Sequence, residues 1–282
     1  MTVPNVHLGL PRAELRKLVM LRWTWVAAGV GVLLAAGTAG ILAARSGVPN
    51  FPGSVHVIHP DVAARLQEQA DAGSLAEYGA IIFGVVGGTI EWRARTWAVS
   101  LTARPRRWDV VVVKFVVAFF GGAAIGVAGT MAAGAVASAF VPHDARVFHL
   151  QHAAGAPTIS MLWHAVATTA PGTALACGLL ATLWSAIGLL VRLPALAVTG
   201  AVAYAVGLRW YLAEAAPNLA RWLPEWASQG FAQSPQALTI AAISGSNQTA
   251  TPSAVAGAVV VTAVVIVAAV AAALSIRRTE RA

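Results

Sequence analysis

Long runs of apolar residues alternate with short polar stretches along the whole chain. The runs cover residues 23–44, 74–92, 110–141, 160–191, 195–212 and 254–276. An α-helix rises about 1.5 Å per residue, so roughly 20 apolar residues are enough to cross a hydrocarbon core about 30 Å thick. The pattern therefore predicts an all-α membrane protein whose six transmembrane helices form one domain, residues 1–282.

Residues 8–22, ahead of the first apolar run, mix leucines with charged residues at helical spacing. The apolar positions are Leu15, Leu18, Val19 and Leu21, and the charged ones are Arg12, Glu14, Arg16, Lys17 and Arg22. This spacing predicts an amphipathic helix with a basic face, suited to lying in the membrane interface. A plain positive flank of the first span explains the same residues equally well, so both interpretations stay open.

Polar residues suggest where the second and third long helices begin. Ser74 and Glu77 have the three-residue spacing of a capping box, which predicts a helix start at Ser74. Asp109 precedes the third apolar run and is a suitable N-cap. That run is longer than one crossing needs, so we expect a strong tilt or an end that projects beyond the bilayer. Between the two helices lies a compact basic segment, residues 93–109.

Residues 213–252, between the fifth and sixth apolar runs, are rich in Trp, Pro and Gln. Trp210, Trp222 and Trp226 lie beside or within this segment, and indole rings favour the membrane interface. We expect the segment on the outer side of the membrane. It is either a half-buried re-entrant element or a solvent-exposed loop.

The distribution of charged residues predicts how the helices are oriented across the membrane. Only 11% of the residues are charged, whereas soluble domains carry roughly 25%. With both termini inside, fourteen of the nineteen Lys and Arg residues fall on the cytoplasmic side, where positive residues accumulate. The five on the outer side are Arg45, Arg65, Arg146, Arg209 and Arg221. We therefore expect a multi-pass protein of the inner (cytoplasmic) membrane with both termini in the cytoplasm.

The sequence lacks the patterns that are typical of nucleic-acid binding and of ATP hydrolysis. The net charge of +8 would suit nucleic acid, but the basic residues sit at the ends of apolar runs, where they orient helices and meet lipid headgroups. Nucleic acid is therefore not an expected partner. The P-loop pattern is absent, so the chain cannot hydrolyse ATP by that route.

The single cysteine, Cys177, lies inside an apolar run and is expected to be a small packing residue.

Histidines in two outer loops raise a metal hypothesis. One loop contains His56 and His59, and the other contains His143, His149 and His152. No matching set of carboxylates and cysteines accompanies them, so we expect no metal site. No His/Glu or Ser/His set clusters at one membrane depth either. The chain is therefore not predicted to be an enzyme, and no catalytic residue is assigned.

Ionisable residues inside a membrane mark ion pathways in many transporters. The candidates here are Glu77, Lys114 and Arg209, and all three fall near the ends of predicted spans. We therefore expect them to extend toward the membrane surface, which disfavours a transporter driven by an ion gradient.

Two pairs of glycines have the spacing that lets helices approach closely. They are Gly84 with Gly88 and Gly122 with Gly126. Packing within the chain is the favoured interpretation, and a dimer interface is the alternative.

The start of the chain resembles the interfacial elbow helix of ABC-2 type transporter permeases, of an actinobacterial kind. The matching stretch is Ala13-Glu14-Leu15-Arg16-Lys17-Leu18 followed by Leu21-Arg22-Trp23-Thr24-Trp25. In the family this helix carries an acidic residue, Lys-Leu, and then Arg with aromatic residues at the start of the first span. The resemblance implies an elbow role for Glu14, Lys17, Leu18 and Arg22.

A second stretch is similar to the same family. It is Glu91-Trp92-Arg93-Ala94-Arg95-Thr96, then Pro105-Arg106-Arg107 and Lys114. The resemblance implies a short cytoplasmic coupling helix that docks on an ATPase subunit. The coupling residues it implies are Glu91, Arg93, Arg95, Thr96, Pro105, Arg106 and Arg107. Arg95 departs from the pattern, because many relatives have Gly before the Thr.

The resemblance implies a permease subunit that exports a hydrophobic or amphipathic substrate, such as a drug, a peptide or a lipid. ATP and Mg²⁺ would be held by a separate nucleotide-binding subunit, with no cofactor on this chain. The second permease would be another copy or a relative, and membrane lipids would be further partners. Two alternatives stay open: a secondary transporter driven by an ion gradient, and a non-transporting immunity or scaffold protein.

Overall fold

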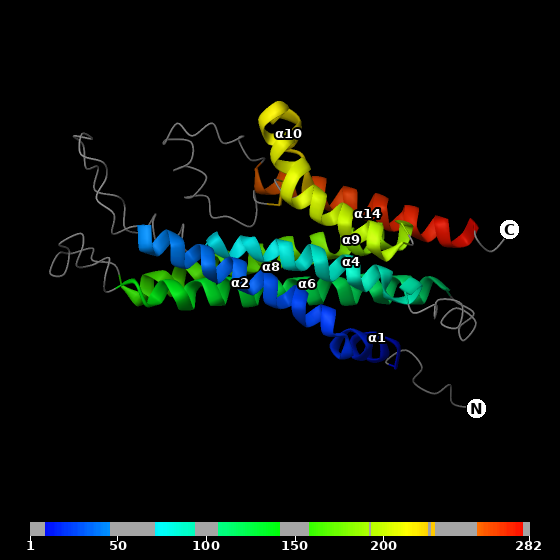
Figure 1. Ribbon diagram of the computed structural model, residues 1–282, viewed down its shortest axis with the longest axis horizontal. Helices are drawn as coiled ribbons and strands as arrows, with labels where there is room; N and C mark the ends of the chain where they lie inside the picture. The colour runs from blue at the N-terminus through cyan, green and yellow to red at the C-terminus, as the bar shows by residue number, and fades with distance from the viewer. Residues whose placement is uncertain are drawn as a thin grey trace.

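The computed structural model describes residues 9–45, 71–93, 107–141, 158–191, 193–224, 227–228 and 253–278. Within these residues it contains helices and no strand (Figure 1). Five helices are long and apolar enough to cross a membrane. The prediction of an all-α multi-pass membrane protein is therefore confirmed at this level.

The helices follow the apolar runs closely. They are α1 (Gly9–Met20), α2 (Arg22–Arg45), the 3₁₀-helix η1 (Ala72–Ala76), α4 (Glu77–Arg93), α6 (Arg107–Ser138), α8 (Ile159–Val191), α9 (Pro194–Ala203), the π-helix η2 (Tyr204–Leu208), α10 (Arg209–Ala215), α11 (Pro217–Ala220) and α14 (Ala254–Arg278). As predicted from its length, the third run forms one uninterrupted helix, α6, of 32 residues.

The second and third long helices begin earlier than their capping residues predicted. η1 starts at Ala72 with Asp71 in the N-cap position, and the Asp71 side chain makes no capping hydrogen bond. α6 starts at Arg107, so Asp109 lies inside its first turn. Both predicted starts, at Ser74 and after Asp109, are therefore wrong. The helices continue through small and polar residues that the apolar pattern leaves out.

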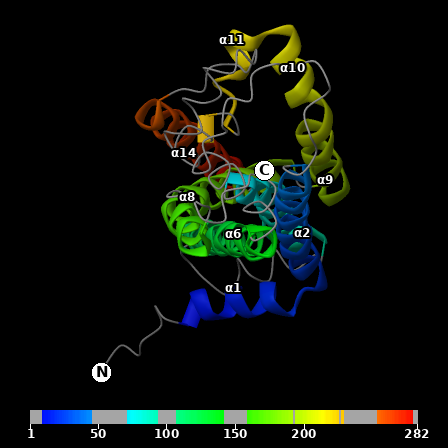
Figure 2. The same cartoon turned by 90° about the vertical axis from the view of Figure 1, so that its left-hand side faces the viewer.

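α2, α4, α6 and α8 form the central bundle (Figures 1 and 2). α4 and α8 are the most buried of the spans, and α2 and α14 are the least buried. α9 packs on α4, and α14 packs on α8. α1 lies across the outside of the bundle against α6, at the end where α4 finishes and α6 begins (Figure 2). We call this end of the bundle the elbow end.

Small residues let α4 and α6 touch the backbone of α8. A Cβ atom added at Gly84 or at Gly88 would overlap the backbone at Ala181 or Ser185 of α8. All four glycines of the predicted pairs face α8 in this way, because Gly122 and Gly126 also contact it, at Cys177. The interpretation of these pairs as packing within the chain is therefore confirmed, and α8 already occupies the surface that a dimer would need.

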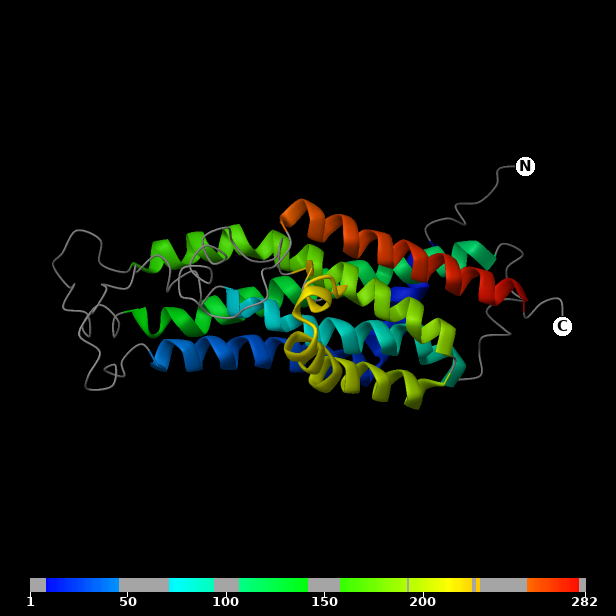
Figure 3. The same ribbon diagram turned by 90° about the horizontal axis from the view of Figure 1, so that it is seen from above.

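The fifth apolar run is helical throughout but is divided into three parts. α9 has only ten residues, and the π-helix η2 separates it from α10. α10 turns away from the direction of the bundle (Figures 1 and 3). The predicted span 195–212 is therefore not one regular α-helix, and a sixth crossing stays a prediction.

Candidate functional site

The turn between α1 and α2 is held by side chains that follow it. The Thr24 hydroxyl donates to the carbonyl oxygens of Leu18 and Leu21, at 2.5 and 2.6 Å. The indole N–H of Trp25 donates to the carbonyl of Val19 at 2.8 Å. The backbone N–H groups of Leu21 and Thr24 also donate to the carbonyls of Leu18 and Leu21, so the side-chain bonds add to this network and fix the direction of the turn. The Thr-Trp pair of the sequence motif therefore has a structural role.

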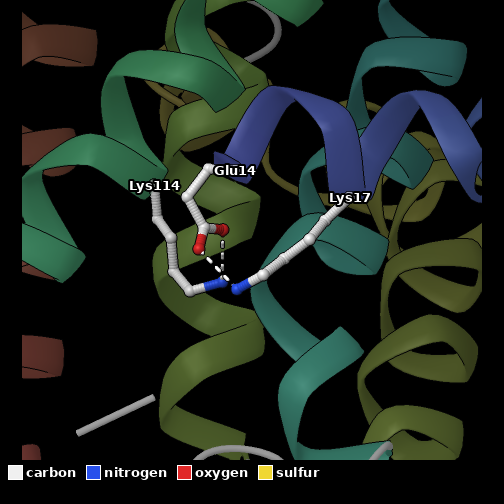
Figure 4. A network of polar contacts seen from close by, with 3 residues as sticks. All are labelled: Glu14, Lys17 and Lys114. Carbon is white, nitrogen blue, oxygen red and sulfur yellow. Dashed lines mark hydrogen bonds and ion pairs between the residues drawn. The ribbon is translucent and has the colours of Figure 1, made fainter. Parts of the chain in front are cut away.

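A buried ion pair joins α1 to α6. The ammonium group of Lys114 lies 3.4 Å from Oε2 of Glu14, and Lys17 donates to Oε1 of the same carboxylate at 2.7 Å (Figure 4). Glu14 is 6% exposed and Lys114 is 5% exposed, whereas Lys17 is much more open. Removing one member of a buried pair leaves the other charge uncompensated, which typically costs about 3–5 kcal/mol. We call Glu14, Lys17, Leu18, Thr24, Trp25 and Lys114 the elbow junction.

Leu18 adds an apolar contact one turn after Glu14. It is buried in a cluster that includes Ala27 of α2, Phe83 of α4 and Val117 of α6. Glu14 and Leu18 are four residues apart and thus lie on the same face of α1. This face holds α1 against three helices of the bundle. Glu14 contributes the ion pair with Lys114, and Leu18, one turn later, contributes an apolar contact.

The ion pair also sets the ionisation of Glu14. Burial raises the pKa of this carboxyl, but the charges of Lys114 and Lys17 and their hydrogen bonds together outweigh burial and hold the pKa below its ordinary value. Glu14 is therefore negatively charged at neutral pH. Since the folded-state pKa is lowered, the stabilisation is present above the unfolded value of about 4.3 and is lost as the pH falls through the folded value.

We expect α1 to stay docked as the pH falls from 7 to about 4.3, and to be released only at lower pH. The measurement is the mobility of a nitroxide label at position 19 of α1, where Val19 is half exposed, in a background in which the single cysteine, Cys177, is replaced by Ala. Glu14→Gln is the control and should show no such transition. Release between pH 5 and 6, or an unchanged transition in Glu14→Gln, would contradict the role of this carboxylate.

Two residues that were expected to extend toward the membrane surface are buried. Lys114 is 5% exposed because α1 covers it, and Glu77 at the start of α4 is 3% exposed. Burial inside the protein was not expected for either residue. That their side chains also extend toward the membrane surface stays a prediction. The side chain of Arg209 lies outside the description, so its placement stays a prediction.

A second polar group lies farther from the elbow end, between α4 and α8. The hydroxyl of Thr169 donates to Oδ1 of Asp71 at 3.3 Å. Gly84 opposes Ala181 and Gly88 opposes Ser185, so the residues of α8 that face α4 recur every four positions. Thr173 and Cys177 continue this row between Thr169 and Ala181.

Thr173 also lies against α6, because a Cβ added at Gly126 would come within 2.9 Å of the Thr173 carbonyl oxygen. Thr173 is fully buried, and its hydroxyl has no hydrogen-bond partner among the residues described. We call Asp71, Glu77, Thr169 and Thr173 the acid–threonine row. Sequence reasoning missed Asp71 and both threonines, because nothing in the sequence shows which face of α8 meets α4.

The predicted coupling residues lie only partly within the described chain. Glu91 and Arg93 are in the last turn of α4 and Arg107 is the first residue of α6, so the backbone brings both ends of the coupling segment to the elbow end. Arg95, Thr96, Pro105 and Arg106 lie outside the described residues. Arg22 was expected in the elbow helix and instead begins α2, because the chain turns at Leu21.

The remaining candidate features lie mostly outside the structure's description. This holds for all five loop histidines and for most of the segment 213–252, of which residues 213–224 and 227–228 are described. Among the residues described, no group of three or more His, Cys, Asp or Glu side chains is placed to hold a metal ion. Cys177 is buried and unpaired, which agrees with its expected role as a packing residue.

Comparison with known proteins assigns no family to this arrangement. No protein-family model matches the chain, and no curated protein matches it either. Its function therefore has to be argued from the elbow junction, from the acid–threonine row and from the fold.

Proposed function

We propose that this chain is the permease subunit of an ABC-2 type ATP-binding cassette exporter. It would move a hydrophobic or amphipathic substrate, such as a drug, a peptide or a lipid, with ATP hydrolysed on a separate subunit. The proposed assembly contains two permeases, the second being another copy or a relative, and two ATPase subunits. ATP and Mg²⁺ would be bound by those ATPase subunits.

One observation carries the proposal. The two stretches that resemble the family are far apart in the sequence, and they meet in the ion pair between Glu14 of α1 and Lys114 of α6, two residues 100 positions apart. If the resemblance arose by chance at both places, there would be no reason for the acidic residue of the first stretch, Glu14, to bind the basic residue of the second, Lys114. Their contact is what a functional unit made of an elbow helix and a coupling segment requires.

The proposed topology has six crossings with both termini in the cytoplasm. α9, η2 and α10 together would supply the fifth crossing, with its outer part bent at the π-helix, and the segment after α10 would be re-entrant. α1 would lie in the cytoplasmic interface of the inner membrane. Its exposed residues Leu15, Val19 and Met20 are apolar and suit contact with lipid.

The mechanism follows from how the helices are tied together. A partner that pushes on the coupling segment would act directly on α4 and α6, because the segment joins their ends. The movement of α6 would reach α1 through Lys114 and Glu14. α4, α6 and α8 touch through their backbones at the glycines, so they would move as one unit and open a path at the interface with the second permease.

The first test of the proposal is purification of the tagged chain from its native membranes in mild detergent. We expect stoichiometric recovery of a soluble subunit that contains a P-loop. We also expect the double charge reversal Arg106→Glu and Arg107→Glu to cut substrate-stimulated ATPase activity by about tenfold or more, with membrane insertion intact. Arg277→Glu with Arg278→Glu, at the end of α14, is the matched control and should leave the activity within twofold.

Unchanged activity in the Arg106/Arg107 variant would contradict the coupling role. Repeated recovery of the chain alone, together with substrate flux in proteoliposomes that lack any ATPase, would contradict the whole proposal. Absence of flux even with the partner present would favour a non-transporting immunity or scaffold protein.

A specific observation favours one second candidate, a transporter driven by an ion gradient. Asp71 and Glu77 are buried acids within the bundle, and the Thr169 hydroxyl donates to Asp71. Buried ionisable residues of this kind line proton and cation pathways in many transporters. This candidate requires flux without ATP, and the reconstitution above separates it from the first.

A further inference from the structure

A shallow basic hollow lies along α1, and its lining does not include the buried residues Glu14 and Leu18. Among the residues that the structure describes, three cationic and two apolar residues of this helix line it. They are Arg12, Ala13, Arg16, Lys17 and Met20, and they line an open hollow with a volume of about 420 Å³. One water molecule occupies about 30 Å³ of liquid, so the hollow has room for a group of ten or more heavy atoms and is larger than a bare ion needs.

The acidic residue of α1 and the cationic residues that line the hollow lie on different faces of the helix. Successive residues of a helix are rotated by about 100°, so Leu15 lies on one flank of the buried Glu14 and Ala13 lies on the other. Glu14 is the one acidic residue of α1, and it points inward to Lys114 (Figure 4). The hollow is therefore lined by cations with no acidic side chain of α1 among them.

The position of α1 indicates which kind of anionic ligand suits the hollow. The helix lies across the outside of the bundle near one end (Figures 1 and 2), where a helix of a membrane protein meets headgroups. Its other flank exposes Leu15 and Val19, and Met20 at the rim of the hollow is 73% exposed. A ligand that suits the site has an anionic group for the arginines and an apolar part that continues along Met20.

We propose that the hollow on α1 binds the phosphate headgroup of an anionic phospholipid. The phosphate oxygens accept hydrogen bonds from Arg12 and Arg16, whose planar guanidinium groups match them in geometry. Lys17 lies between the lipid site and the ion pair, because it lines the hollow and also donates to Glu14. A bound lipid thus reinforces the docking of α1 on α6, and this holds whichever partner drives the protein.

The test uses the full-length chain, purified in a neutral detergent, with bound lipid counted by native mass spectrometry. The probes are dioctanoyl phosphatidylglycerol and dioctanoyl phosphatidylcholine, which have equal chain lengths and different net charge. We expect at least about tenfold tighter retention of the phosphatidylglycerol, and loss of that preference in the double variant Arg12→Gln, Arg16→Gln, since each charged hydrogen bond counts for a large factor. The preference should also weaken as salt is raised.

Arg22→Gln is the matched control for the single variant Arg16→Gln, because each removes one exposed basic residue and Arg22 lies at the start of α2, outside the lining of the hollow. The preference should survive in Arg22→Gln. Equal loss in both variants would overturn the proposal, since it would reduce the effect to net charge. Competition by glycerol 1-phosphate at the same concentration as the lipid would overturn it in favour of a free-anion site.

An acidic protein surface is the other macromolecule that could cover the hollow. In that case the Arg12/Arg16 variant would lose a copurifying protein and would keep its lipid preference. That result would also overturn the proposal. Circular dichroism of the variants guards against a trivial loss by misfolding, because retained helix content with lost lipid preference supports the site.

Discussion

Reversing the charge of Glu14 is expected to release α1 from the bundle, and exchanging the two charges is expected to restore it. In Glu14→Lys, three ammonium groups would meet in a buried place where the native chain has one carboxylate between two. We expect a loss of about 3–5 kcal/mol in the free energy of unfolding. The double variant Glu14→Lys, Lys114→Glu should recover more than half of that loss, because the pair is again of opposite charge.

The measurement is thermal unfolding of the purified chain in detergent, evaluated as a double-mutant cycle. Arg16→Glu is the matched control, since it reverses a charge two residues later, on the exposed face of α1, and we expect it to change the free energy by less than about 1 kcal/mol. If Glu14→Lys were as mild as Arg16→Glu, the ion pair would not hold α1. Additive single effects in the double variant would mean that the two residues act independently.

Adding one methyl group at Gly84 is expected to be among the most damaging small changes in the described part of the chain. The Cβ of Gly84→Ala would overlap the carbonyl of Ala181, so α4 would have to move away from α8 along most of their contact. Overpacking of this kind costs about 1–3 kcal/mol where side chains can adjust, and backbone atoms adjust least. We expect a loss at the upper end of that range or beyond, with reduced yield of folded protein.

Gly37→Ala in α2 is the control, because nothing lies within 4 Å of the position where its Cβ would be. Replacing Gly by Ala in an open helix position is expected to be neutral or to stabilise by up to about 1 kcal/mol. The two variants carry the same substitution in apolar helices and should differ in sign. Equal stability of both in thermal unfolding would show that α4 and α8 do not pack as described.

The sequence predicted the spans well because the signal for a membrane helix is local. A run of about 20 apolar residues needs no information from the rest of the chain, and the described helices α2, α6, α8 and α14 match their runs to within a few residues. The fifth run was harder, since the π-helix η2 that divides it involves ordinary apolar residues. Nothing in the composition of Tyr204–Leu208 marks it.

The candidate site was less predictable because it depends on contacts between distant segments. Lys114 near a span end was expected to extend toward the membrane surface, and only the placement of α1 over α6 shows why it is buried. The resemblance singled out Glu14 and Lys114 separately without pairing them. Likewise, the sequence does not distinguish Thr169 from the other residues of its apolar run. Its hydrogen bond to Asp71 depends on how α8 packs against α4.

The central place of α8 has a consequence for biosynthesis. A membrane protein is inserted as it is made, with its N-terminal helices first, so α4 and α6 enter the bilayer before α8 exists. During that interval their glycine-lined surfaces face lipid or another newly made helix, and small residues there invite foreign helices. Arrival of α8 closes both surfaces in one step. The close contacts at the glycines of α4 and α6 can therefore form only after the fourth long helix has been made.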